Sequence, residues 1–455
     1  MRRGRFQKQR PNPLTFPAPR RHSMGRFLQE KLRLKYNLRR TAQFALAALF
    51  FAAGIGARAQ DAPPSAREPI PYYVSAFDKV WKTVRDKFWD KNTNGVDWRK
   101  VGQQYRAQLP NVQTKMEFET LINAMLRELH ASHTEYTTDD DVGFYMFPAV
   151  MDGNLQKHRV AHIGVMGQAE PGGWRVAAVL DGGPSDKAGL RSGDLILSAG
   201  GHPFTSAGSC RGKEGREILL TVKRNGEPAP LTLKPIPMYE NPLAAFVKAT
   251  ERSARILDVG GRKIGYIHLW TMANSAFKDA LDRAVSEKLA DTDALILDLR
   301  DGYGGSPFGY FDLFATPDIT WEQTGRDGIV THHTGYDRPM AVLINGGTRS
   351  AKEYFTLQFK KSKRATVIGA TTTGAFLGAG GFPITQDGYL ELPVVGLRLD
   401  GKKIEGVGVP PDIAVAASHS YTPQDAQRLR AEQVLLEAVR ALPPRTKSGR
   451  EVVRR

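Results

Sequence analysis

The chain has 455 residues, enough for two or three domains, and an ordinary globular composition. Its formal net charge of +17 is concentrated at the start, because residues 1–60 contain 14 Lys and Arg but only one acid. The rest carries only +4, with no basic stripe interleaved with aromatic residues, so we expect no nucleic-acid partner. The single cysteine, Cys210, excludes an internal disulfide and a metal site built from cysteines.

The first 60 residues have the pattern of an export signal. Two arginines precede an apolar run from Phe44 to Ala57, and Ala57-Arg58-Ala59 fits a small-x-small cleavage site. The run has 14 residues, fewer than the ~20 that span a bilayer. We therefore expect a periplasmic or secreted protein that meets a membrane only during export. An uncleaved anchor in the inner membrane is the alternative, and Met24 could be the true start.

Residues 61–150 are predicted to form a helical N-terminal region. Apolar residues between Val74 and Phe88 recur at three- and four-residue steps, the period of an amphipathic helix. Asp97 is placed to cap a second helix near residues 98–109. A third helix is predicted at 117–129, ending before His130-Ala131-Ser132-His133-Thr134.

Residues 158–237 change to short strands and turns. Asn225-Gly226 between two strand-like runs is the strongest hairpin signal in the chain. Residues 179–197 resemble a PDZ domain. Their sequence is Val-Leu-Asp-Gly-Gly-Pro-Ser-Asp-Lys-Ala-Gly-Leu-Arg-Ser-Gly-Asp-Leu-Ile-Leu. The resemblance implies that polypeptide C-termini bind at a sheet edge, with backbone N–H groups of Ile163, Gly164 and Val165 holding the carboxylate. A packing module without a ligand is the alternative.

Residues 241–418 alternate strands and helices, which predicts an α/β domain. The apolar run 294–299 predicts a strand covered on both faces, followed by a Gly-rich turn and a helix from Phe308 to Phe314. Met340 to Ile344 predicts another buried strand, which leads through a tight turn into a helix near Ser350. A C-terminal helix and a basic tail are expected at 419–455.

Ser350 is a candidate nucleophile because it follows that sharp turn. A hydroxyl raised into a cleft there lies beside the unpaired N–H groups of a helix start, which suits an oxyanion hole. A serine at a helix start can equally be a simple cap. The residues of this stretch alone leave both interpretations open.

From about residue 72 to 415 the chain resembles the C-terminal processing protease and tricorn-core serine peptidases. These proteins place a helical region and a PDZ-like domain before a crotonase-like (ClpP-like) α/β core. The resembling segments occur in the family's order. They are Val96-Asp97-Trp98, Leu129-His-Ala-Ser-His-Thr134, the PDZ-like segment, Leu297-Asp-Leu-Arg300 with Gly304-Gly305, Ser350-Ala-Lys-Glu353, and Glu405-Gly-Val-Gly-Val-Pro-Pro-Asp-Ile413.

The resemblance implies a catalytic tetrad. Ser350 would be the nucleophile, His133 the general base, Ser132 a bridge and Glu405 the acid behind it. A serine hydroxyl needs an adjacent base to attack, and imidazole titrates near neutrality. Taken singly, each member has an ordinary structural alternative, and His130 is a rival for the base.

The same resemblance assigns the oxyanion hole to the N–H groups of Gly304 and Ala351. The family's other layout, a Ser–Lys dyad, is disfavoured because Ala375 stands where its lysine would be. Lys352 does not match that position either. No metal, nucleotide or other cofactor is implied.

We therefore expect an exported serine endopeptidase that cleaves unfolded or C-terminally recognised polypeptides. A non-catalytic peptide- or ligand-binding protein on the same fold is the alternative, because a fold does not fix a function. An esterase or amidase that uses the tetrad on a small substrate is a third. The oligomeric state stays open.

Overall fold

The computed structural model describes residues 69–315, 319–326, 328–333, 335–417, 420–440 and 442. The expected export signal and the basic tail lie outside these residues. Everything described belongs to one unit, Arg67–Arg455. None of the helices within the described ranges is both long enough and apolar enough to cross a bilayer.

Three helices form the N-terminal region, and two of them begin at side-chain caps. They are α2 (Pro71–Lys87), α3 (Trp98–Arg106) and α4 (Lys115–Arg127). Asp97 accepts a hydrogen bond from the Lys100 N–H at 3.0 Å, which confirms the predicted cap of α3. Thr114 and Glu117 form a capping box at the start of α4.

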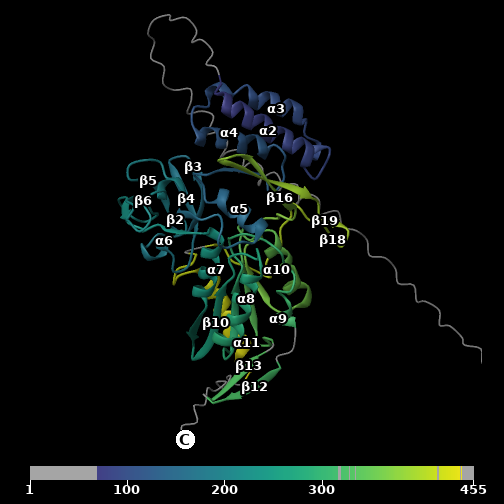
Figure 1. Cartoon of the computed structure of the whole chain (residues 1–455). Helices are drawn as coiled ribbons and strands as arrows, with labels where there is room; N and C mark the ends of the chain where they lie inside the picture. Colours follow the sequence, from purple (N-terminus) through teal and green to yellow (C-terminus); the bar gives the residue numbers. More distant parts are fainter. Residues whose placement is uncertain are drawn as a thin grey trace, which may run out of the picture. The chain divides into compact units, whose positions relative to one another are not determined.

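The prediction that residues 61–150 are helical misses a strand. β1 (Glu135–Thr138) runs antiparallel to β17 (Gly388–Val395), which also pairs with β16 (Gly378–Thr385). Tyr136 and the two threonines favour extended backbone, but the pairing depends on a partner far along the chain. The helix α5 (Gly143–Asp152) follows β1. The three-stranded sheet lies next to α2 (Figure 1).

The PDZ-like segment is a five-stranded antiparallel sheet in the order β3-β4-β5-β6-β7. Its strands and its one short helix are β3 (Val165–Glu170), β4 (Gly173–Val179), α6 (Pro184–Lys187), β5 (Leu195–Ala199), β6 (Leu220–Lys223) and β7 (Leu231–Leu233). The Asn225-Gly226 turn joins β6 to β7 as predicted. β2 (Val160–His162) pairs with β8 (Met238–Glu240), so the two ends of the segment are held together.

The α/β domain contains a six-stranded sheet in the order β20-β15-β14-β11-β10-β9, parallel except for the β9–β10 pair. Its strands are β9 (Arg255–Val259), β10 (Arg262–His268), β11 (Ala294–Asp298), β14 (Met340–Ile344), β15 (Thr366–Gly369) and β20 (Ile413–Ala414). The helices are α7 (Pro242–Ser253), α8 (Ser275–Arg283), α9 (Asp312–Ala315), α10 (Ala351–Ser362) and α11 (Ala426–Val439). Two short hairpins complete the domain, β12 (Thr320–Gly325) with β13 (Gly328–His333) and β18 (Arg398–Leu399) with β19 (Lys402–Lys403).

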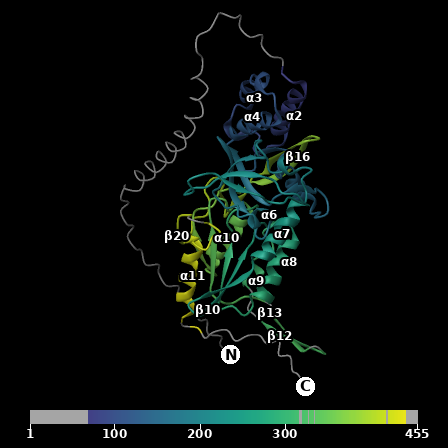
Figure 2. The same ribbon diagram turned by 90° about the vertical axis from the view of Figure 1, so that its left-hand side faces the viewer.

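Helices cover both faces of this sheet. α11 packs on one face through Ala431, Leu435 and Val439, and α7 to α10 pack on the other (Figure 2). Every residue of β11 is buried, which confirms the predicted two-sided burial. The helix predicted from Phe308 to Phe314 is wrong in extent, because Gly309 has φ +77° and α9 begins only at Asp312.

Candidate active site

Ser350 stands between β14 and α10, at the N-cap position of the helix. Its φ of +57° and ψ of −126° are uncommon for a residue with a Cβ, so the surroundings must hold this conformation. The Ser350 N–H donates to Glu353 Oε2 at 2.9 Å. The same carboxylate accepts from the N–H groups of Gly374 and Ala375 at 2.7 and 2.8 Å. Glu353 thus fixes the Ser350 backbone against the turn that precedes β16.

The predicted oxyanion donors lie against Ser350. A Cβ built on Gly304 would be 2.4 Å from Ser350 Cβ, 2.6 Å from its Oγ and 3.1 Å from the Ala351 nitrogen. The Gly304 carbonyl accepts from the Met272 N–H and the Thr271 hydroxyl, each at 2.8 Å, which fixes the loop. Neither the Gly304 N–H nor the Ala351 N–H donates to another residue in the described part of the chain. Both donors are therefore available to a ligand.

His133 follows α4 with φ +57°, and its side chain is buried. Its Nδ1 lies 2.7 Å from Oε1 of Glu391 on β17. Burial opposes ionisation of Glu391, but the hydrogen bond to His133 and the charges of His133 and Arg349 outweigh it and lower the pKa of Glu391. Because an ionised carboxylate only accepts, Nδ1 carries the hydrogen of this contact, which leaves the lone pair of the neutral ring on Nε2. Nε2 is buried and has no partner among the residues described.

The bridge expected through Ser132 is not formed. Ser132 Oγ is buried and has no hydrogen-bond partner within the described ranges. The Glu405 carboxylate instead accepts from the backbone N–H groups of Ser132 and Phe376, each at 2.8 Å. Glu405 therefore holds the backbone beside His133, whereas the carboxylate on the ring is Glu391.

Glu391 is absent from the residues predicted from the sequence. It stands in the otherwise apolar strand β17, and a lone acid in such a strand is the signal that could have drawn attention to it. The rival base His130 is exposed and does not line the cavity that contains Ser350.

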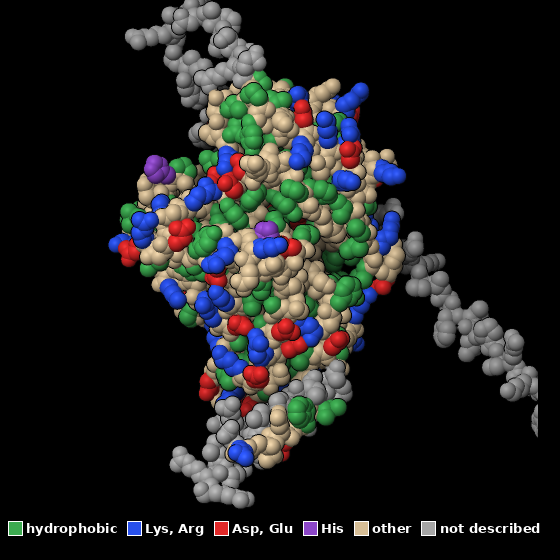
Figure 3. Space-filling model, in the orientation of Figure 1, with side chains coloured by type: hydrophobic (Ala, Val, Ile, Leu, Met, Phe, Trp, Pro, Cys, Tyr) green, Lys and Arg blue, Asp and Glu red, His purple; other side chains and the backbone are tan. Residues whose placement is uncertain are grey.

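One cavity of about 670 Å³ brings most of the site together. Ser350, His133, Glu391, Gly304 and Ala351 all line it. Most other lining residues are apolar; they include Phe147, Val150, Met151, Phe308, Leu377 and Leu397. Figure 3 shows hydrophobic side chains gathered near α5 and β16 and again over the N-terminal helices, whereas charged side chains of both signs are interspersed over much of the rest of this face. An extended polypeptide with apolar side chains would fit such a cavity.

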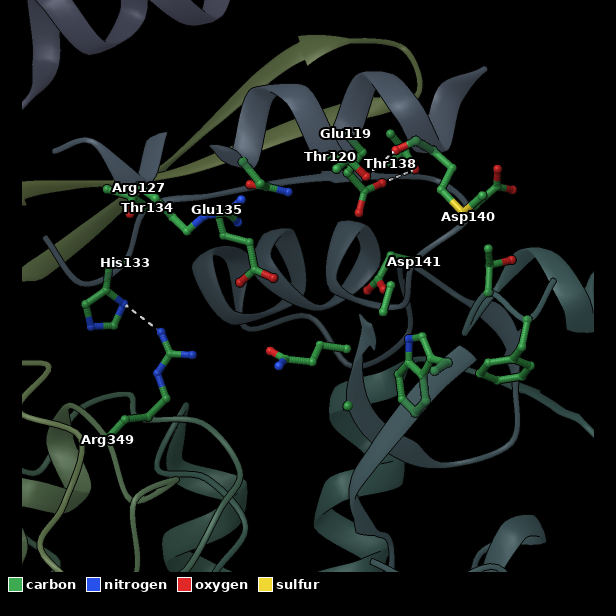
Figure 4. A pocket seen from close by; sticks show the side chains of 18 of the residues that line it. Glu119, Thr120, Arg127, His133, Thr134, Glu135, Thr138, Asp140, Asp141 and Arg349 are labelled. Carbon is green, nitrogen blue, oxygen red and sulfur yellow. Dashed lines mark hydrogen bonds between the residues drawn. The ribbon is translucent and has the colours of Figure 1, made fainter. Parts of the chain in front are cut away.

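A second cavity, of about 580 Å³, shares His133 and Arg349 with the first. The Arg349 guanidinium reaches towards the His133 ring (Figure 4), and its Nη2 is 3.4 Å from Nδ1. Carboxylates of Glu119, Glu135 and Asp141 also line this cavity. The Glu135 residue keeps exposed surface, but the many protein atoms around its carboxyl group disfavour the charge, and together with the charge of Glu391 they raise the pKa of Glu135 to about 7.

The predicted peptide-binding residues Ile163, Gly164 and Val165 lie at the start of the edge strand β3. The carbonyls of Ile163 and Gly164 accept hydrogen bonds from the chain, but their N–H groups donate to no other described residue. Further along β3, residues 167–169 line the second cavity. The free edge of the PDZ-like sheet thus leads to the cavity that His133 borders.

Lys352 is buried and does not line the cavity around Ser350. Its Nζ donates to the Asp301 carbonyl at 2.8 Å, next to the loop that carries Gly304. Burial lowers the pKa of Lys352 to about 7, although the charges of Asp298 and Asp301 act in the opposite direction. Lys352 therefore supports the loop that carries Gly304 and does not reach the cavity that contains the hydroxyl.

We expect Lys352→Met to remove a pH dependence of stability. Unfolded lysine titrates near 10.4, so between about pH 7 and pH 10 the unfolded state binds more protons and stability rises with pH. The difference in free energy of unfolding between wild type and variant should grow in favour of wild type by up to about 1.4 kcal/mol per pH unit. Urea unfolding at pH 7.5 and 9.5 measures it. Lys361→Met, at an exposed position of α10, should show no such change, and an equal change in both variants would contradict the assignment.

Three segments of the chain match known families. Residues 263–415 match peptidase family S41, residues 73–127 match the tricorn protease C1 domain, and residues 161–234 match the PDZ domain. These matches cover the core, the helical region and the five-stranded sheet described above.

The chain is also similar to individual proteins. The chain is 25% identical to tricorn protease homolog 1 of Streptomyces coelicolor over 401 residues, which cover 83% of this chain and 36% of that one. It is 26% identical to the chloroplastic carboxyl-terminal-processing peptidase 2 of Arabidopsis thaliana over 373 residues, 74% of this chain and 67% of that one. The solved photosystem II D1 C-terminal processing protease aligns with a TM-score of 0.48 at 21% identity, over 80% of this chain and 97% of the other. The chain spans about a third of the length of the tricorn homologues it matches.

Proposed function

Because residues 263–415 match peptidase family S41, we propose that the chain hydrolyses peptide bonds with Ser350 as the nucleophile. The observation that carries this proposal is the cavity that Ser350 and His133 line together with Gly304 and Ala351, whose N–H groups donate to none of the described residues. Such an arrangement supplies a nucleophile, a base and two oxyanion donors in one place.

In the proposed reaction, His133 Nε2 takes the proton of Ser350 Oγ as the oxygen attacks the peptide carbonyl carbon. The negative charge that develops on the carbonyl oxygen is stabilised by the N–H groups of Gly304 and Ala351. Collapse of the intermediate breaks the C–N bond, and His133 gives the proton to the leaving amine. Water, deprotonated by His133, then hydrolyses the ester on Ser350 and restores the enzyme.

The proposed substrates are unfolded polypeptides, some of them recognised by their C-termini. The apolar cavity supports binding of extended chains, and the free edge of β3 supports recognition by strand addition. The family match of the PDZ segment and the name of the Arabidopsis relative point the same way. Export to the periplasm or secretion is proposed from the N-terminal pattern alone, with an inner-membrane anchor as the alternative.

Labelling with a fluorophosphonate probe tests the proposal. Wild type should be labelled, whereas Ser350→Ala should not, and His133→Ala should react at least 100-fold more slowly because the hydroxyl loses its base. Ser75→Ala, at an exposed position of α2, is the matched control and should label like wild type. Unfolded casein should be cleaved in preference to small esters.

Two results would contradict this function. Equal labelling of wild type and Ser350→Ala would favour the non-catalytic binding protein. Hydrolysis of small esters without cleavage of casein would favour the esterase.

A further inference from the structure

Two carboxylates lie near His133, the buried Glu391 and the half-buried Glu405, but they make different contacts. Glu391 Oε1 is 2.7 Å from Nδ1 of the ring. Both oxygens of Glu405 accept backbone N–H bonds at 2.8 Å, one from Ser132 and one from Phe376. Ser132 Oγ, through which Glu405 would have to act, has no partner among the described residues.

The contact with Glu391 has a direct chemical consequence for the base. An acceptor on Nδ1 fixes the tautomer in which Nε2 keeps its lone pair and can take the proton of Ser350, and a carboxylate there stabilises the imidazolium that forms during attack. The side chains of His133 and Glu391 are only 8% and 7% exposed, so water screens their interaction little. We infer that Glu391 is the positioning acid of His133, and that Glu405 instead fixes the backbone around it. This inference rests on the proposed peptidase activity.

Arg349 places a positive charge beside the same His133 ring, opposite in sign to the charge of Glu391. Its Nη2 lies 3.4 Å from Nδ1, and it forms no ion pair with an acid in the described ranges. A cation beside the imidazole disfavours the imidazolium, whereas Glu391 favours it. Two residues of opposite charge therefore lie beside Nδ1 of the ring.

Other charged groups face this assembly from the elements packed around it. They are Glu135 on β1, Glu119 and Arg127 on α4, Asp140 and Asp141 before α5, Arg398 on β18, and Glu405 before β20. Of these acids, only Glu405 hydrogen-bonds within one residue of His133, and it does so through the backbone N–H of Ser132. Substitution of Glu405 is therefore the decisive comparison for Glu391.

The test is the pH profile of kcat/KM for peptide cleavage by the full chain. Glu391→Gln should lower kcat/KM by about 100-fold and move the acidic limb to lower pH, because the ring loses the charge that favours its protonation. Arg349→Gln should move the acidic limb to higher pH. Glu405→Gln should lower the Tm but leave the acidic limb in place. Glu391→Asp, which keeps the charge, should restore the limb towards its wild-type position.

Each outcome decides the question. An unmoved limb in Glu391→Gln, or a limb that moves in Glu405→Gln, would overturn the assignment and return the role to Glu405. Circular dichroism of each variant confirms that it is folded, and Glu391→Asp separates charge from packing if Glu391→Gln unfolds. Failure of wild type to label with the fluorophosphonate would instead reject the proposed function itself.

Discussion

Glu353→Gln is expected to destabilise the folded protein by about 2–6 kcal/mol. The Glu353 carboxylate is fully buried and accepts hydrogen bonds from the N–H groups of Ser350, Gly374 and Ala375 and from the Thr372 hydroxyl. Glutamine keeps one acceptor oxygen and turns an NH₂ group towards the other donors. At least two buried donors then lose their partner, at about 1–3 kcal/mol each.

The same substitution should also lower the rate of reaction at Ser350. The positive φ of Ser350 is held in part by its N–H bond to Glu353, so the hydroxyl and the neighbouring oxyanion donor should lose their alignment. We expect fluorophosphonate labelling at least 10-fold slower than in wild type, measured beside the urea unfolding curve. Glu437→Gln, at an exposed position of α11, should match wild type in both measurements. Wild-type stability and labelling in Glu353→Gln would show that the carboxylate does not hold the turn.

Sequence patterns correctly predicted the elements that depend only on residues close together in the chain. The cap at Asp97, the Asn225-Gly226 hairpin and the strand β11 are as expected, because each depends on residues within a few positions. The turn and helix around Ser350 belong to the same class. The resemblance to the peptidase family added the prediction that Ser350 and His133 belong to one site, which no local pattern could supply.

The hydrogen-bond partners of the site could not be predicted in this way. Glu391 reaches His133 only because β17 pairs with β1 in the register that sets Glu391 opposite Glu135. That register is fixed by tertiary packing of strands more than 250 residues apart, and a shift by one residue would turn Glu391 to the other face. A motif also gives residue types but not the hydrogen bonds that they form. Glu405 was predicted to act through Ser132 Oγ, but its carboxylate accepts a hydrogen bond from the Ser132 backbone N–H instead.

Gly304→Ala should lower kcat/KM for peptide cleavage by about 10²–10³-fold, the loss associated with one oxyanion donor. The added Cβ would lie 2.4 Å from Ser350 Cβ and 2.6 Å from its Oγ, closer than atoms can approach. Either the loop or the Ser350 side chain must move, and the space between the two predicted donors is lost. The backbone of Gly304 is outside the left-handed region, so the expected loss comes from this contact and not from a conformational preference.

Gly346→Ala provides the matched control for this steric effect. Gly346 lies on the turn just before Ser350, and a Cβ there would meet nothing within 4 Å. Both substitutions add one methyl group to the same region, so only Gly304→Ala should lose activity, while Tm reports any general loss of stability. If the two variants cleaved peptide equally well, Gly304 would not border the oxyanion, and the second donor would have to be sought elsewhere in the cavity. If Gly304→Ala were inactive at an unchanged Tm, the loss would lie in the active site and not in folding, as expected from the proximity of Gly304 to both Ser350 and the Ala351 nitrogen.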